Sequence, residues 1–224
     1  MLLRSRGRAG ARLPAPHVTL SLTAVNVYTV YVDTKDQILA AARAAFDRGG
    51  VEALSLRDIA REVGITPMAI YRHYANKQAL IDALVLDGLA EWSARAQAVP
   101  RGDPRAWFEA MGDAFLDFAL EQPRRFEAAF LVRTEVARRY PDDFLAGRSP
   151  AGVLYLQFFA AARAQGAIDD TDPIEIMITI AGLSQGLITL YRAGRIAGGE
   201  AGFRALFKRA MGRTIQSFLT ETPR

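Results

Sequence analysis

Apolar side chains recur every three or four residues from Thr34 to near the end of the chain, which is the period of one face of an α-helix. The first such stretch opens with Thr34 and Gln37, the spacing of a capping box that satisfies the backbone of a first helical turn. It ends at Gly49 and Gly50, which favour a helix stop. The pattern therefore predicts a first helix over about 34–49.

Three more helices are expected in the first hundred residues. Ser55 can cap the second helix and Gly64 can end it, because glycine tolerates the left-handed conformation that follows many helices. Thr66 and Pro67 open the third, with proline in the first turn, where its missing N–H is not needed. Asn76 caps a long fourth helix. These helices are expected over about 56–63, 66–74 and 76–99.

Five further helical segments follow, separated by clusters of proline, glycine and aspartate. No stretch after residue 34 alternates apolar and polar side chains as a strand would, so neither a parallel sheet nor a nucleotide-binding crossover fold is expected. The chain is therefore expected to be all-α, with about nine helices in total. The five segments are 104–121, 124–139, 151–165, 173–193 and 200–220.

The composition limits the chemistry. Half of the 224 residues are hydrophobic and 23% are charged, a globular balance that argues against wholesale disorder. No stretch reaches the roughly 18 unbroken apolar residues of a membrane span, so we expect a cytoplasmic protein without membrane contact. Because cysteine is absent and His17 and His73 are the two histidines, we expect no metal, no cofactor and no enzymatic activity. Glu109, Asp113 and Asp117, four residues apart, are interpreted as a solvated helix face.

Positive charge gathers toward the N-terminus, where it can meet an acidic polymer such as nucleic acid. Residues 34–80 carry seven basic and five acidic side chains, whereas the residues after them have a net charge of −1. Residues 1–33 carry four arginines and one aspartate, and we expect a basic, disordered extension there. Polar residues interrupt its apolar run, which argues against a secretory signal. It is either an arm that touches DNA or the product of a start codon assigned too far upstream.

The stretch 56–77 has the size and the turn of a helix-turn-helix. Its second helix would fit the major groove of DNA with its first residues aimed at base edges. Any two short helices joined by a tight turn have the same spacing, so the alternative is a simple αα-hairpin.

The residues themselves resemble the DNA-binding domain of TetR-family transcriptional regulators. The motif runs Ser-Leu-Arg-Asp-Ile-Ala-Arg-Glu-Val-Gly-Ile-Thr over 55–66, Ile-Tyr-Arg-His-Tyr over 70–74 and Asn-Lys-Gln-Ala-Leu over 76–80. The likeness extends without gaps from about residue 34 to residue 84. It implies a three-helix helix-turn-helix DNA-binding domain over 34–80 and a helical ligand-binding and dimerisation domain over 81–224.

This resemblance assigns DNA contacts to the recognition helix and its flanks. Base contacts fall at the start of that helix, where Met68 and Ala69 would offer apolar contact to thymine methyl groups. Tyr71 and Lys77 correspond to phosphate-contacting positions, although Tyr71 could instead pack in the small core. The expected DNA-binding residues are Ser55, Thr66, Pro67, Met68, Ala69, Tyr71, Arg72, His73 and Lys77.

Aromatic side chains are dense between residues 104 and 165, enough to line an apolar pocket between helices. The alternative is that most of them are ordinary core residues. The segment 107–130 resembles the WHG subgroup of ligand domains, but Gln185 stands where that subgroup has the histidine before Gly186. The expected pocket residues are Trp107, Phe108, Phe115, Phe118, Phe130, Phe158 and Met177.

The last two predicted helices are the candidates for a homodimer interface, which the resemblance implies. Gly182 and Gly186 are four residues apart and would permit close approach of helices. Two helices from each subunit, 173–193 and 200–220, would form a two-fold four-helix bundle, unless they cover the core of the monomer. The expected interface residues are Ile178, Gly182, Gly186, Phe207 and Met211.

The resemblance implies a ligand-responsive regulator, a repressor that a small apolar effector releases from a palindromic operator in double-stranded DNA. The effector would favour one angle of the helix over 76–99 and thus one spacing of the two recognition helices. The alternatives are a helical small-molecule- or lipid-binding module, which leaves the helix-turn-helix unexplained, and a non-specific DNA-binding protein, which predicts no preferred sequence.

Overall fold

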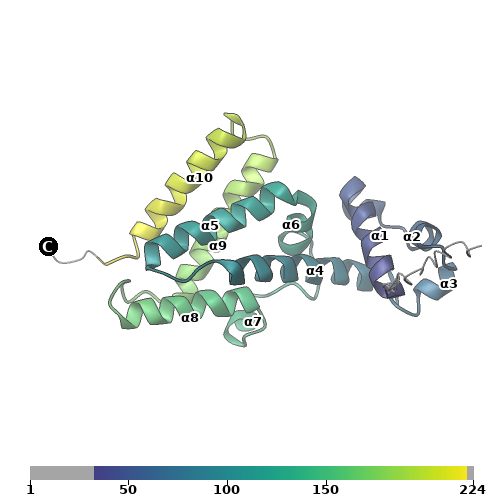
Figure 1. Ribbon diagram of the computed structural model, residues 1–224, viewed down its shortest axis with the longest axis horizontal. Helices are drawn as coiled ribbons and strands as arrows, with labels where there is room; N and C mark the ends of the chain where they lie inside the picture. The colour runs from purple at the N-terminus through teal and green to yellow at the C-terminus, as the bar shows by residue number, and fades with distance from the viewer. Residues whose placement is uncertain (1–32, 221–224) are drawn as a thin grey trace, which may run out of the picture. The chain divides into compact units, whose positions relative to one another are not determined.

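Ten α-helices and one 3-10 helix make up the computed structural model, which describes residues 33–220 (Figure 1). Within those residues there is no β-strand, and the one β-type contact is an isolated bridge between Ile168 and Leu219. The all-α prediction is confirmed. The elements are α1 (Thr34–Gly49), η1 (Gly50–Ala53), α2 (Leu56–Val63), α3 (Pro67–Ile70), α4 (Lys77–Ala98), α5 (Pro104–Glu121), α6 (Pro123–Phe130), α7 (Asp142–Leu145), α8 (Pro150–Ala164), α9 (Pro173–Arg192) and α10 (Gly199–Gln216).

The start of α1 differs from the predicted capping box. The Asp33 side chain accepts a hydrogen bond from the backbone N–H of Lys35 (3.1 Å), so Asp33 rather than Thr34 is the N-cap. Aspartate at this position also places negative charge at the positive end of the helix dipole. The expectations for residues 1–32 lie outside the described residues.

Side-chain and glycine caps define α2. The Ser55 hydroxyl accepts a hydrogen bond from the backbone N–H of Asp58 (3.3 Å), as predicted. Gly64 ends the helix with φ at 76°, in the left-handed region that favours glycine. The backbone N–H of Ile65 then donates to the carbonyl of Ala60 (2.9 Å), which satisfies the helix end.

Helix α3 begins as predicted but is shorter. The Thr66 hydroxyl accepts from the backbone N–H of Ala69 (3.2 Å), and Pro67 occupies the first turn. The regular helix ends at Ile70, after which tight turns carry the chain to Tyr74. The predicted end near residue 74 is therefore the end of these turns.

The predicted helix over 124–139 is wrong. Helix α6 ends at Phe130, and an irregular connection over 131–141 leads to the separate α7. Val132 packs against the core of the N-terminal helices, and the Thr134 hydroxyl donates a hydrogen bond to Asp82 of α4. These tertiary contacts hold the chain in a non-helical path that the local pattern did not indicate.

An aliphatic core holds the first helices together. It is formed by α1, α2, α3 and the start of α4, and Ala128 of α6 also contributes. Ile59 of α2 and Ile70 of α3 are only 1% and 0% exposed, so both helices of the helix-turn-helix are fixed against this core.

Aromatic rings dominate the second core, which lies among α4–α6 and α8–α10. Trp92 meets Phe115 edge-on, with ring centroids 4.8 Å apart, and Trp107 stacks on Phe158 at 3.9 Å. Such aromatic pairs contribute about 0.5–1.5 kcal/mol beyond the burial of their surface.

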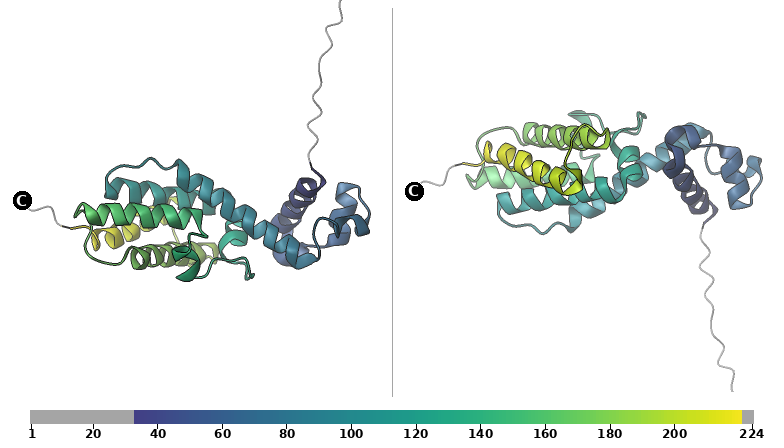
Figure 2. Two further views of the ribbon diagram at one scale, coloured as in Figure 1. Left: turned by 90° about the horizontal axis from the view of Figure 1, so that it is seen from below. Right: turned by 90° about the horizontal axis from the view of Figure 1, so that it is seen from above.

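Helix α4 belongs to both cores. Leu80 and Leu84 lie in the aliphatic core, whereas Trp92 and Ala96 lie in the aromatic one. Figure 2 shows α4 running from the N-terminal helices into the bundle formed by the later helices. A displacement of α4 in one core would therefore also change the packing of the other core.

Helices α4 and α6 meet closely at Gly88. A Cβ atom on Gly88 would lie 2.8 Å from the backbone oxygen of Arg125, so a larger residue does not fit. Next to it, Asp87 accepts hydrogen bonds from Arg43 of α1 (2.9 Å) and from Arg125 (3.0 Å). This carboxylate on α4 connects α1 with α6.

Helix α10 covers α5 through apolar and charged contacts. Phe203 and Phe207 are buried, and Arg204 and Lys208 pair with Asp117 (2.5 Å) and Asp113 (2.8 Å) of α5. The predicted solvated carboxylate row thus bonds partly to a neighbouring helix. Across residues 33–220, no cluster of three or more side chains suitable for a metal ion occurs.

Helix α9 is the one described helix that is long and apolar enough to cross a membrane by length and composition alone. In the structure it packs against α5, α8 and α10. Ile176 and Ile188 are fully buried in these contacts, which account for part of its apolar character.

Candidate functional site

Helix α3 is the recognition helix of the helix-turn-helix, and five of the nine predicted DNA-binding residues, all on it or directly beside it, are exposed to solvent. Met68 is 73% exposed and Tyr71 is 50% exposed, which argues against the alternative that Tyr71 packs in the core. Thr66, Pro67 and Arg72 are also exposed, whereas the remaining members of the predicted set are half-buried. The half-buried members are Ser55, Ala69, His73 and Lys77.

Unpaired positive charge surrounds this helix. Among residues 33–220, Arg57, Arg72 and Lys77 form no ion pair, whereas the acidic Asp58 and Glu62 pair with Arg61 (2.9 Å) and Arg48 (3.7 Å). The Ser55 hydroxyl, followed by Arg61, lowers the pKa of Asp58. Arg57 was not predicted as a DNA-binding residue, although its place two residues after the Ser55 cap could have indicated it.

Tyr74 is a buried residue just after the recognition helix. It is 4% exposed, and its hydroxyl donates to the backbone oxygen of Lys35 (3.4 Å). Burial raises the pKa of this tyrosine, which stays neutral at physiological pH. Tyr74 is therefore a core residue that joins α1 to the end of the helix-turn-helix.

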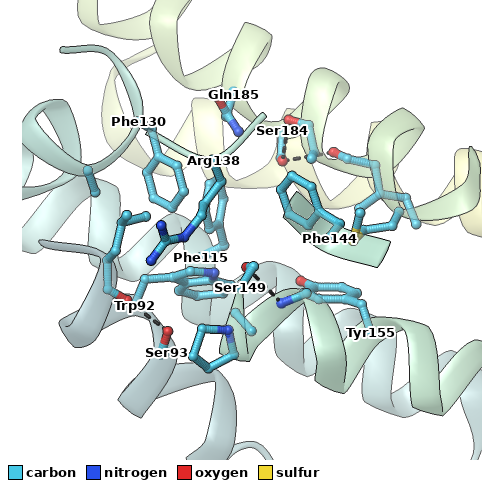
Figure 3. Close-up of a pocket in the computed structure, with 18 of the residues that line it drawn as sticks. Trp92, Ser93, Phe115, Phe130, Arg138, Phe144, Ser149, Tyr155, Ser184 and Gln185 are labelled. Carbon is cyan, nitrogen blue, oxygen red and sulfur yellow. Dashed lines mark hydrogen bonds between the residues drawn. The ribbon is translucent and has the colours of Figure 1, made fainter. Parts of the chain in front are cut away.

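A cavity of about 580 Å³ opens in the helical bundle. Helices α4, α5, α6, α8 and α9 line it together with the connection over 131–141, and α7 and α10 add one residue each, Phe144 and Met211. Figure 3 shows its aromatic wall. This volume lies within the range of about 300–1,000 Å³ that is typical of small-molecule pockets.

Four of the seven predicted pocket residues line this cavity. They are Phe108, Phe115, Phe130 and Met177. Trp107, Phe118 and Phe158 do not line it, because their rings pack in the aromatic core. Four of the predicted residues thus line a cavity, and the other three are ordinary core residues, as the alternative expected.

Other lining residues were missed as pocket residues. Trp92 and Tyr155 contribute rings from α4 and α8, and Phe144 contributes one from α7. Ser93 and Ser184 donate their hydroxyls to backbone oxygens of their own helices (2.8 Å each), so these polar groups are already satisfied. Arg138 reaches the cavity from the irregular connection, which the sequence pattern had assigned to a helix.

The predicted interface residues divide into two groups. Ile178, Gly182 and Gly186 are exposed on one face of α9, and a Cβ on either glycine would meet nothing within 4 Å. Phe207 and Met211 are only 1% and 5% exposed, because α10 uses them to cover α5 and α9. These two side chains pack within the protomer, which leaves little of their surface for a partner.

Comparison with known proteins identifies the class to which the fold and the helix-turn-helix point. Residues 38–84 match the family model of bacterial regulatory proteins of the tetR family, and residues 108–214 match the model of the tetracyclin repressor-like C-terminal domain. The second match replaces the expected likeness to the WHG subgroup. The chain belongs to the tetR family, and its class is that of helix-turn-helix transcriptional regulators.

One relative agrees with this assignment, and two solved structures show a similar fold. The chain is 30% identical over 174 residues to the tetracycline repressor protein class A from transposon 1721 of Escherichia coli, covering 75% of this chain and 73% of that one. A protein of unknown function from Rhodococcus sp. RHA1 has a similar fold, with a TM-score of 0.71, 23% identity and coverage of 86% and 98%. A TetR variant from Acinetobacter baumannii AYE in complex with minocycline gives a TM-score of 0.60, with 20% identity and coverage of 83% and 95%.

Proposed function

We propose that the protein is a homodimeric repressor that a small apolar effector releases from a palindromic operator. The observation that carries this proposal is that α4 begins directly after the turns that follow the recognition helix and then lines the cavity with Leu89, Trp92 and Ser93. A ligand in the cavity would contact the same rigid element that positions Lys77 at the DNA. The proposal includes no catalytic activity.

The regulation follows from two orientations of α4. An effector that binds one orientation better shifts the population toward it, by no more than its difference in affinity for the two. In a dimer, that orientation sets the distance between the recognition helices. Only a separation of about 34–36 Å matches successive major grooves.

We assign the dimer interface to α9, with α8 as the second helix. Ile178, Gly182, Gly186 and Leu190 form an exposed stripe along α9. On α8, Ala160, Ala161 and Ala164 are exposed and small enough for close helix approach, whereas the outer face of α10 carries Lys208, Arg209 and Arg213. Helices α8 and α9 pack together, so both can join a two-fold four-helix bundle.

A selection of binding sites from genomic fragments, with the purified protein, tests this proposal. The expected result is a palindromic or near-palindromic consensus bound by a dimer, with affinity lowered by an apolar ligand. Selection of unrelated fragments would instead indicate a non-specific DNA-binding protein. A protein that binds apolar ligands but no fragment would be a small-molecule-binding module.

A further inference from the structure

The cavity carries a single charge. Among the lining residues from the described part of the chain, 33–220, Arg138 is the one basic side chain, and no aspartate or glutamate is present. Aromatic and aliphatic side chains from helices α4 to α10 form most of the remaining wall. In Figure 3 the Arg138 side chain extends into the cavity on the side of Trp92 and Phe130.

Arg138 differs from the other half-buried arginines in having no acidic partner. Within residues 33–220 six other arginines are half-buried, and each forms an ion pair with a carboxylate. They are Arg43, Arg95, Arg124, Arg125, Arg192 and Arg204. The one hydrogen bond from Arg138 in the described residues goes to the backbone oxygen of Val136 (3.3 Å).

Two acidic residues close to Arg138 in sequence are already engaged. Glu135 pairs with Arg139 (2.8 Å). Asp143 accepts a hydrogen bond from the backbone N–H of Arg139 (2.7 Å) and forms an ion pair with Arg148. These two contacts, with a smaller contribution from Arg138, lower the pKa of Asp143. The guanidinium of Arg138 thus keeps most of its hydrogen-bonding capacity for a group that enters the cavity.

A guanidinium in an apolar cavity selects for negative charge. It presents N–H donors in a planar fork that matches a carboxylate with two parallel hydrogen bonds, and such charge-assisted bonds are stronger than neutral ones. The hydroxyl of Tyr155 is a second donor on the wall and has no hydrogen-bond partner in the described residues. A cationic ligand would meet like charge without a counter-ion.

We propose that the effector is an apolar organic acid whose carboxylate pairs with Arg138 and whose hydrocarbon part contacts the aromatic wall. This inference rests on the proposed function, because it takes the occupant of the cavity to be the effector. It adds the chemical class of that ligand and the residue that selects it.

The position of Arg138 also links such an acid to the DNA-binding half. Arg138 lies on the connection over 131–141, whose Thr134 bonds to Asp82 near the start of α4. Val132, on the same connection, packs against the aliphatic core and lines the cavity. An anion that repositions Arg138 therefore acts on a segment that contacts α4 a few residues after Lys77.

A matched pair of probes tests the inference. 2-Naphthoate and the neutral 2-naphthamide have nearly the same shape and differ in charge, and titration calorimetry measures their affinities. Trp92 lines the cavity and Trp107 does not, so a change in tryptophan fluorescence that is lost in Trp92→Phe reports binding there. We expect naphthoate to bind about tenfold to a hundredfold more tightly, the effect of a hydrogen bond to a charged group.

Arg138→Gln should abolish this preference and leave naphthamide affinity unchanged, which also shows that the variant is folded. Arg133→Gln is the matched control, because Arg133 lies on the same connection, is exposed and does not line the cavity. It should keep the preference. If Arg138→Gln loses both probes, Arg138→Lys decides, since it keeps the charge: a retained preference supports the inference and a lost one overturns it.

Equal binding of the two probes, or binding of neither, overturns the inference. Operator binding by the unliganded protein, measured by fluorescence anisotropy, is a separate readout. Its absence would overturn the proposed function itself. Release of the operator by both probes alike would support that function and overturn the acidic effector.

Discussion

The N-terminal helices and the helical bundle place their functional residues differently. In the first region, Ser55, Thr66 and Asn76 each cap the helix that follows, through bonds to a backbone N–H three residues later. These local bonds leave side chains such as Met68 pointing to solvent. In the second region the cavity is built by side chains from helices far apart in sequence.

The residues of the first region are positioned by local sequence, whereas those of the second are positioned by tertiary packing. A cap and its partner are three residues apart, so a short stretch of sequence determines where the recognition helix begins. Whether Phe115 lines a cavity or a solid core depends on what packs beside it. Helix α4 joins the two regions, so variants along it and at the proposed dimer surface test how far the two regions depend on each other.

The largest expected effect comes from Gly186→Asp on α9. Its Cβ meets open space in the protomer, so the fold of both regions should persist. In the proposed dimer the aspartate would block close helix approach and bury an unpaired charge, a change of several kcal/mol. Sedimentation should show a monomer, and operator affinity should collapse while circular dichroism stays unchanged.

Gly212→Asp on α10 is the matched control for this interface. Its Cβ also has nothing within 4 Å in the protomer, and α10 lies outside the proposed interface. It should remain dimeric. A monomeric Gly212→Asp beside a dimeric Gly186→Asp would move the interface to α10 and show that the bundle presents a different outer face.

Gly88→Ala should break the connection between the two regions. The new Cβ would lie 2.8 Å from a backbone oxygen of α6, and overpacking of this kind costs about 1–3 kcal/mol. The melting temperature should fall. Gly212→Ala, in a helix with free space, should instead raise stability by up to about 1 kcal/mol. If Gly88→Ala melted at the same temperature as the wild type, α4 and α6 would separate easily. The two regions would then be more independent than the contact implies.

The extent of sequence-based prediction follows the same division. The caps at Ser55 and Thr66 and the stop at Gly64 were predictable, because each acts within its own turn. The place of Arg138 in the cavity wall was not, because the apolar period continues across 124–139, whereas α6 ends at Phe130 and a bond from Thr134 to Asp82 holds the following chain against α4. Likewise, the apolar stripe of α10 could not show whether Phe207 faces its own core or another subunit.

Lys77→Ala should affect DNA binding without affecting the bundle. Lys77 has no acidic partner in residues 33–220, and its role as a phosphate contact predicts weaker binding to every sequence. The slope of log affinity against log salt should fall by about one unit, measured on specific and random duplexes. Lys208→Ala, which removes the same charge from the ion pair with Asp113, should leave that slope unchanged. Equal slopes for all three proteins would remove Lys77 from the DNA interface.

The smallest expected effect is the pH dependence of the α4–α6 contact. Glu91 of α4 accepts a hydrogen bond from Arg95 (2.9 Å) and lies 3.4 Å from Arg125 of α6. The bond from Arg95, followed by the charges of Arg125 and Arg95, holds the pKa of Glu91 below its ordinary value of 4.5. Because the folded-state pKa is lowered, the stabilisation is present above pH 4.5 and is lost as the pH falls through the folded value.

Glu91→Gln should therefore lower the free energy of unfolding at pH 7 and approach the wild type in acid. For partly exposed ion pairs this difference is up to about 1 kcal/mol. Urea unfolding at several pH values measures it. Glu135→Gln is the control, because that carboxylate is 89% exposed and pairs only with Arg139 in the described residues. If the difference in unfolding free energy between Glu91→Gln and the wild type stayed constant into acid, the Glu91 side chain would act by packing alone. Its charge would then not stabilise the α4–α6 contact.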